Sequence, residues 1–332
     1  MVIYFLSKFF TALIFCKAEY EVFNTQFTTE LSLYLSMACF FKKFGMPKGY
    51  LIAVGGAEDK GEEAKVKKNR LDFFSEGILR QIVELAGKRA NPKIELITTA
   101  SSIPDEIAQV YKKAFRKLGC DEVGHLRLRT REEAENKKVL ERLSKCNCIL
   151  FSGGDQLKLC SALGGTQFIK IVEDRYYDEH FVIAGTSAGA AAMSNTMICG
   201  GNENRAFMKG EVEMNIGFGL LQNVIIDTHF DARGRFGRLV QAIATQPGAI
   251  GIGLDEDTAI IVEKGNRIKA IGASSVVVVD GSHVACNNIA SIKNGMPLSI
   301  SNVSVHVMSH SDMFDMTTRE FTAFKHASTE TE

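Results

Sequence analysis

Apolar and polar residues follow two alternating patterns along the chain from residue 49 onward. Short apolar runs predict buried β-strands at residues 50–54, 148–151, 181–184 and 224–226, and runs in which polar residues interrupt the apolar ones predict two more, at 94–98 and 123–128. Between them, apolar residues recur at helical spacing and predict amphipathic helices at residues 71–85, 107–118, 132–143, 157–163 and 239–244. This alternation is typical of an α/β fold in which helices cover both faces of a largely parallel sheet.

The last third of the chain has a different pattern. Short β-type runs at residues 258–262, 268–271, 276–279 and 303–307 lie close together and predict hairpins. Before them, residues 199–219 are rich in glycine, and we expect a mobile segment there. The predicted fold class is therefore α/β: a three-layer α/β/α sandwich with a mostly parallel central sheet and C-terminal β-hairpins.

The first 45 residues differ from the rest. Their apolar stretches, 3–16 and 31–41, are each too short to span a bilayer. One interpretation is a secretory signal, although no clean cleavage site follows. The other, which we favour, is that the functional chain begins near Met46, which predicts a cytoplasmic protein without stable membrane association. The expected division is an extension at 1–47, a single catalytic α/β domain at 48–325 and a tail at 326–332.

The composition limits the partners. Among 332 residues, 39 Lys and Arg balance 39 Asp and Glu, so nothing indicates binding to nucleic acid or an anionic membrane. The eight cysteines are scattered singly apart from Cys146 and Cys148, and no second pair lies at metal-ligand spacing. We expect buried thiols of a reduced protein, no metal site and no cofactor.

The chemistry centres on the stretch Gly185-Thr186-Ser187-Ala188-Gly189, which follows an apolar strand and precedes an alanine-rich helix. A serine on such a sharp strand-to-helix turn has strained backbone geometry, and the flanking glycines remove the Cβ atoms that would block the turn. We interpret this stretch as a nucleophile elbow. The amide of Ala188 lies at the helix N-terminus and is a candidate oxyanion donor.

A serine nucleophile needs a base and a group that orients the base. Of the seven histidines, His229 follows an apolar strand and has polar neighbours, so it is the candidate base. For the carboxylate, residues 255–257 (Asp-Glu-Asp) end another apolar strand. In an extended segment Glu256 would point opposite to the aspartates on either side, and spacing leaves both orientations open. Asp227, two residues before His229, is a rival.

Two further stretches complete the predicted site. Gly153 and Gly154 allow backbone amides to approach a ligand closely and are candidates for a second oxyanion donor, while Gln156 is a candidate substrate contact. Directly after His229 the sequence places three arginines, at positions 233, 235 and 238. Guanidinium groups bind carboxylates bidentately, so this cluster suits a substrate that carries carboxylates.

Taken together and in this order, the motifs at residues 55–60, 151–156, 185–190, 227–238 and 255–259 closely resemble the cyanophycinases, part of a serine peptidase family that also includes aspartyl dipeptidases. The resemblance covers about residues 48–320. It implies a fold like that of class I glutamine amidotransferases, with serine in place of the cysteine nucleophile. It also implies Ser187 as nucleophile, His229 as base and Glu256 as orienting acid.

The resemblance further implies a substrate. Such enzymes cleave cyanophycin, a poly-aspartate whose side chains carry arginine, and release β-aspartyl-arginine dipeptides from the chain end; they form homodimers. The family pattern places around the substrate Gln156, Asp227, Arg233, Arg235 and Arg238. Thr228 stands where glutamine is expected, which puts one substrate contact in doubt. The alternatives are an aspartyl dipeptidase of the same family and an inactive ligand-binding protein of the same fold.

Overall fold

The computed structural model describes residues 45–61, 71–87 and 91–325. A compact unit begins at Pro47 and contains all the helices and strands named below. The extension predicted at 1–47 and the tail at 326–332 lie almost entirely outside the described residues. None of the helices in the described ranges combines the length and the apolar character that crossing a bilayer requires.

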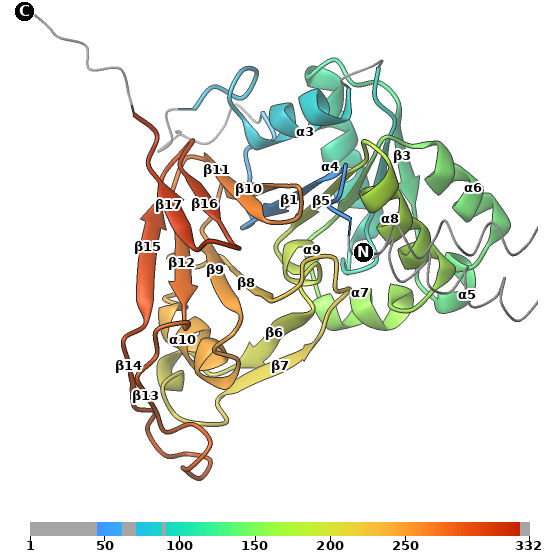
Figure 1. Ribbon diagram of the computed structural model, residues 1–332. Coiled ribbons are helices and arrows are strands. Elements are labelled where there is room, and N and C mark those ends of the chain that lie inside the picture. The colour runs from blue at the N-terminus through green and yellow to red at the C-terminus, as the bar shows by residue number, and fades with distance from the viewer. Residues whose placement is uncertain (1–44, 62–70, 88–90, 326–332) are drawn as a thin grey trace, which may run out of the picture. The chain divides into compact units, whose positions relative to one another are not determined.

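The larger of the two main sheets has nine strands in the order β17-β16-β11-β10-β1-β5-β4-β2-β3 (Figure 1). Its parallel half contains strands that the apolar runs predict, namely β1 (Tyr50–Val54), β2 (Ile94–Ile97), β3 (Val123–Leu126), β4 (Cys148–Phe151) and β5 (Val182–Thr186). Its antiparallel half is C-terminal and consists of β10 (Thr258–Glu263), β11 (Arg267–Gly272), β16 (Met313–Asp315) and β17 (Glu320–Thr322). Parallel pairing brings the carboxyl ends of β1, β5 and β4 to one edge, where ligands bind in such sheets.

Helices cover both faces of this sheet. Successive side chains of β1 alternate between two apolar clusters, with Leu51 and Ala53 in one and Ile52 and Val54 in the other. Ile52 and Val54 share their cluster with α3 (Ile78–Ala86) and α4 (Pro104–Lys117). The opposite cluster includes α5 (Arg131–Ala134), α6 (Lys137–Lys145), α7 (Gln156–Leu163) and α8 (Gln167–Asp178). The predicted three-layer α/β/α sandwich is confirmed.

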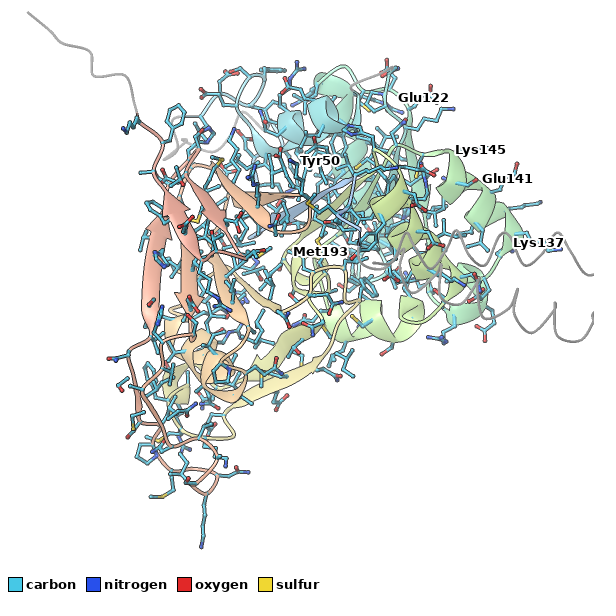
Figure 2. All side chains as sticks on the ribbon, viewed as in Figure 1. Tyr50, Glu122, Lys137, Glu141, Lys145 and Met193 are labelled. Atoms are coloured by element: carbon cyan, nitrogen blue, oxygen red, sulfur yellow. The ribbon has the colours of Figure 1, made fainter. Side chains whose placement is uncertain are left out.

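Helix α6 shows how sequence pattern sets the orientation of a covering helix. Leu143 is fully buried, whereas Lys137, Glu141 and Lys145 lie four residues apart on the exposed side (Figure 2). Lys145 Nζ is 2.6 Å from Glu141 Oε1. This spacing places successive side chains on the same helix face, so the charged residues remain in water while the apolar ones pack on the sheet.

A second sheet, in the order β15-β12-β9-β8, stands beside the first. Its parallel strands are β8 (Val224–Thr228) and β9 (Ile250–Leu254), joined by α10 (Phe236–Thr245). Two antiparallel strands, β12 (Val276–Asp280) and β15 (Ser304–Met308), complete it. A small ladder of β13 (Cys286–Asn287) and β14 (Ile300–Ser301) follows. The apolar runs predict the main strands here but not their separation into a second sheet.

The glycine-rich segment at 199–219 contains regular structure that the sequence does not predict. Strand β6 (Thr196–Gly201) and strand β7 (Val212–Ile216) form an antiparallel pair, and the short helix η1 (Glu203–Arg205) lies between them. The register shifts between residues 198 and 200, and Gly201 has a φ of 123°. Glycine is therefore used here to form an irregular strand pair rather than an open loop.

Two helices are shorter than the sequence ranges over which apolar residues recur at helical spacing. The periodicity at 71–85 yields only α3, because the Asp72 carboxylate accepts the amides of Phe74 at 2.8 Å and Ser75 at 3.0 Å and forms a turn instead. The predicted helix 132–143 is divided into α5 and α6. Asn136 caps the second of these by accepting the Lys138 amide at 2.9 Å.

Candidate active site

Ser187 lies on a tight turn between β5 and the short helix α9 (Ala188–Ala191). Its φ of 50° is in the left-handed region that residues other than glycine seldom adopt. A Cβ at Gly185 would lie 2.6 Å from the carbonyl carbon of Gly189, and a Cβ at Gly189 would lie 2.4 Å from the carbonyl oxygen of Phe151. Both flanking glycines are therefore needed for the strand-turn-helix geometry that the sequence predicts.

The Ser187 hydroxyl faces His229, with Oγ 3.1 Å from Nε2. On the other side of the ring, Nδ1 lies 2.7 Å from Oε1 of Glu256. The His229 side chain is 15% exposed and that of Glu256 is 46% exposed, so the imidazole is shielded while the carboxylate remains partly in water. The structure thus brings the three predicted residues into one hydrogen-bonded chain.

The other three candidate carboxylates have different partners. Asp255 accepts a hydrogen bond from the Ser274 hydroxyl at 2.8 Å, and Asp257 accepts one from a backbone amide at 2.9 Å. Asp227 is bound to arginines. Residues 255–257 form a turn in which Asp257 has a φ of 49°, not the extended segment considered from the sequence, and this turn directs Glu256 toward the imidazole.

One short piece of main chain holds all three segments of this arrangement. The carbonyl oxygens of residues 54, 55 and 56 accept hydrogen bonds from the amides of Ser187 at 2.9 Å, His229 at 3.0 Å and Asp257 at 2.9 Å, in that order. A Cβ at Gly56 would lie 2.6 Å from His229 Nε2. The absence of a side chain at this position therefore lets the imidazole approach β1.

Two amides near the serine are available as donors. A Cβ at Gly153 would lie 3.4 Å from Ser187 Cβ, so the loop after β4 runs directly beside the elbow. Within the described parts of the chain, the amides of Gly153 and Ala188 have no hydrogen-bond acceptor. The neighbouring Gly154 has a φ of 138° and packs against Ala100. This arrangement leaves two N–H groups free for an oxyanion beside Ser187.

The predicted substrate contacts Gln156 and Thr228 lie in different surroundings. Gln156 begins α7, and its Nε2 donates to the carbonyl of Ile198 in β6 at 2.9 Å. Thr228 ends β8, is buried, and its carbonyl accepts from Arg235 at 2.6 Å. Gln156 is thus held by β6 and the Thr228 carbonyl by Arg235, and the contact of both residues with substrate remains a prediction.

The arginines after His229 are divided between interior and surface. Asp227 is 2% exposed and receives Arg238 bidentately, with Nε 2.6 Å from Oδ2 and Nη2 on Oδ1. Arg235 Nη1 also approaches Asp227, at 3.4 Å, while its Nε donates to Glu203 at 2.8 Å. Arg233 is exposed. No sequence signal pointed to Glu203, because it lies in the segment expected to be mobile.

These environments predict effects of very different size on the free energy of unfolding for two arginine substitutions. Arg238→Ala is expected to lower the free energy of unfolding by about 3 kcal/mol, because it leaves the buried Asp227 charge with poorer compensation. Arg233→Ala, the matched control, is expected to change it by less than about 0.5 kcal/mol. Urea denaturation of both variants measures the difference. Equal stability of the two would contradict a structural role for the buried pair.

Residues 55–60 are among the motifs that carry the family resemblance, but the sequence did not predict the role of Glu58. This side chain is 4% exposed and accepts hydrogen bonds from the Thr186 hydroxyl at 2.8 Å and from the Tyr111 hydroxyl. Lys60 Nζ lies 3.2 Å away. Burial alone would raise the pKa of Glu58, but Lys60 and the two hydroxyls together lower it below its ordinary value. Glu58 thereby fixes the loop to the residue next to Ser187.

Glu58→Gln is expected to lower the free energy of unfolding by about 2 kcal/mol at pH 7, because charge-assisted hydrogen bonds are lost. Since the folded-state pKa of Glu58 lies below the ordinary value of about 4.3, its contribution is present above that pH and disappears as the pH falls through the folded-state pKa. Urea denaturation across pH 3–7 should show the two proteins converging in acid. Glu76→Gln, at an exposed position, should show no such difference. A constant gap between wild type and Glu58→Gln would contradict the ionised state of Glu58.

An α/β fold that presents a serine on a strand-to-helix elbow against a histidine and a glutamate defines a serine hydrolase. The comparison with family models then identifies the family of serine hydrolases. The chain belongs to peptidase family S51, whose model matches residues 67–270. The protein is therefore a serine-type peptidase.

Curated relatives are similar in sequence to this chain over most of its length. Cyanophycinase from Synechococcus elongatus is 35% identical over 276 residues, which is 82% of this chain and 81% of the relative. Cyanophycinases from Trichormus variabilis and Geminocystis herdmanii are 35% and 33% identical, over 81% of this chain and 86% and 94% of their own lengths. A solved peptidase from an acI-B1 Actinobacterium matches 80% of this chain and 98% of its own, with a TM-score of 0.53 and 22% identity, which supports the fold.

Proposed function

We propose that this peptidase hydrolyses cyanophycin and releases β-aspartyl-arginine dipeptides through an acyl-enzyme. The observation that carries the proposal is the hydrogen-bonded chain from Glu256 through His229 to Ser187, in a protein 33–35% identical to cyanophycinases over about four fifths of its length. The chain of bonds supplies the chemistry, and the relatives supply the substrate class.

Acylation begins when His229 Nε2 accepts the proton of the Ser187 hydroxyl while Oγ attacks the scissile carbonyl carbon. Glu256 holds Nδ1–H, so the tautomer that leaves Nε2 free to accept is favoured, and it stabilises the imidazolium that forms. The 3.1 Å between Ser187 Oγ and His229 Nε2 is within reach for this proton transfer, and the 2.7 Å between His229 Nδ1 and Glu256 Oε1 is a hydrogen bond that keeps the ring in place.

The tetrahedral intermediate places negative charge on the former carbonyl oxygen. The amides of Gly153 and Ala188 flank Ser187 and supply two donors for this oxyanion. Collapse of the intermediate breaks the C–N bond, and the imidazolium gives its proton to the leaving amine. Water, deprotonated by His229, then attacks the ester carbon and restores the Ser187 hydroxyl, releasing the acid product.

Arg233 lies four positions after His229 in the sequence and is exposed, so its guanidinium can bind a substrate carboxylate. A β-aspartyl-arginine unit keeps the α-carboxylate and the guanidinium of its arginine, so each unit offers both charges. We include in the proposal a contact of such a unit with Gln156, Arg235 and Arg238. The ion pairs with the buried Asp227 hold the two arginines in place.

Mass spectrometry of the soluble products tests the proposal. The full chain is incubated with cyanophycin, and a sample pretreated with a serine-directed phosphonate is the control. We expect β-aspartyl-arginine from the untreated enzyme alone. Absence of product from folded protein, with cleavage of short aspartyl peptides, would establish the aspartyl dipeptidase alternative. Failure of the phosphonate to label Ser187 would revive the inactive ligand-binding alternative.

We also propose a homodimer, which the family resemblance supports, and a cytoplasmic location, which follows from a functional chain that begins near Met46. Light scattering on the purified full chain measures the first, and a monomer at all concentrations would contradict it. Cell fractionation measures the second. Recovery of activity outside the cell, with the first 45 residues removed, would instead show that they act as a secretory signal.

A further inference from the structure

A cavity of about 480 Å³ opens near the carboxyl edge of the large sheet, beyond the active site. Its walls come from the segment after β2, the segment after β3 and helix α7. The residues that matter for its chemistry are Thr99, Ser101, Arg129, Arg131, Lys158 and Ser161. The catalytic arrangement described above uses none of them.

The cavity is linked to the oxyanion loop by backbone contact. The carbonyl oxygen of Ala100 accepts the Asp155 amide at 2.9 Å, and a Cβ at Gly154 would lie 2.1 Å from the same oxygen. Strand β5, which carries the serine elbow, is followed across the sheet by β4 and then by β2. Two strand spacings correspond to about 10 Å, or about three residues of an extended chain. A polymer seated at Ser187 is long enough to reach the cavity.

The charge of the cavity has one sign. Three cationic side chains line it, and among the described residues no carboxylate does. Arg131 is held in place by donating to the carbonyl of Gly164 at 2.6 Å. Arg129 and Lys158 form no ion pair within the described ranges, and both are exposed. The nearby Glu133 carboxylate is occupied by the backbone amides of residues 129 and 130 at the start of α5. Among the described residues, an anion entering the cavity therefore meets donors from the lining and no lining carboxylate.

Hydroxyl groups add to this character. Thr99 Oγ1 is buried and has no hydrogen-bond partner among the described residues. A buried polar atom without a partner is unfavourable, and such atoms are few in native structures. Ser101, Ser102, Thr130 and Ser161 complete the polar lining. The combination of cations and hydroxyls is the donor set that binds carboxylates.

We propose that this cavity is a substrate subsite that binds an arginyl α-carboxylate of the polymer about three backbone residues from the scissile bond. The proposal rests on the proposed function, because it requires a substrate with repeated carboxylates. Within the described part of the chain, the cavity has no lining carboxylate that would attract the guanidinium of the same unit, so it binds the α-carboxylate of the arginine and not its guanidinium. Its effect is to increase affinity for long chains without changing chemistry at Ser187.

Steady-state kinetics on two substrates tests the subsite. The double variant Arg129→Gln/Lys158→Gln removes two charges that have no ion-pair partner among the described residues, and Arg116→Gln/Lys170→Gln removes two exposed charges elsewhere. On long cyanophycin chains at low salt, the first pair is expected to raise KM about tenfold with kcat unchanged. On a two-unit oligomer too short to reach the cavity, it should leave KM unchanged. High salt should shrink the effect.

Three outcomes would overturn the subsite. One is an equal rise in KM for both substrates, another is the same rise in the control pair, and a third is no rise at all. If added free aspartate changed turnover of the two-unit oligomer in wild type but not in the double variant, the cavity would bind a small free acid instead. Failure of wild type to cleave either substrate would count against the proposed function, not against the subsite alone.

Discussion

Ser187→Ala is expected to lower kcat on cyanophycin by a factor of about 10⁴–10⁶, because the variant has no atom with which to form the acyl-enzyme. The substitution removes one oxygen and adds nothing to the tight turn between Gly185 and Gly189, so the fold should remain intact. Single-turnover assays with product detection by mass spectrometry measure the loss, and circular dichroism checks the fold.

The remaining turnover is itself informative. The amides of Gly153 and Ala188 are unchanged in the variant, so a small rate above that of water is expected from the oxyanion donors and substrate binding. Affinity for the substrate should be retained. Turnover within tenfold of the wild-type rate would exclude Ser187 as the nucleophile and, with it, the acyl-enzyme.

Glu256→Gln is expected to lower kcat by a factor of about 10³–10⁴, because an amide at this position no longer stabilises the imidazolium and can favour the wrong tautomer. KM should change little, since Glu256 contacts His229 through Nδ1, on the side away from Ser187. Steady-state measurement of kcat and KM for wild type and variant, at the same pH, checks this split.

Matched variants separate this role from the general effect of removing a charge. Asp255→Asn and Asp257→Asn remove neighbouring charges; the one amide oxygen of asparagine can replace the acceptor of the Asp59 amide at residue 257 and one of the two acceptors that Asp255 supplies to Ala232 and Ser274. Both are expected to retain kcat within about tenfold of wild type. A loss in either variant as large as that of Glu256→Gln would mean that the carboxylate facing His229 in solution is not the one the structure shows.

Sequence pattern predicted the strands of the parallel half of the large sheet and the serine elbow, and it singled out His229, which the structure places beside Ser187 and whose role as base remains a prediction. Short apolar runs do not by themselves distinguish strand from helix, but here they alternate with segments of helical periodicity, and Gly185 and Gly189 have a steric role that any chain with this turn must satisfy. The same reasoning left the acid open among residues 227 and 255–257. Successive side chains alternate between two faces only in an extended strand. Residues 255–257 lie on a turn, where the direction of the Glu256 side chain depends on the φ of Asp257.

Long-range pairing was the main feature that the sequence did not predict. The ion pairs of Asp227 with Arg235 and Arg238 join the end of a strand to a helix start, and they place two arginines inside the protein that would read as surface charges. Likewise Glu58 and Tyr111 are 53 residues apart. Spacing along one strand or helix carries information on neighbours within that element, whereas contacts between elements depend on topology.

The three successive carbonyls of residues 54–56 make the active site a single cooperative unit. Because they bind the amides of Ser187, His229 and Asp257, a local opening that detaches this main chain releases all three amides together. Hydrogen exchange, measured where reclosing is fast, should therefore give these amides one common free energy of opening, higher than that of the surrounding loops. Three consecutive residues of one chain segment thus set the spacing between the nucleophile, the base and the acid. Local unfolding of that segment disrupts all three positions together, so the site is either complete or absent.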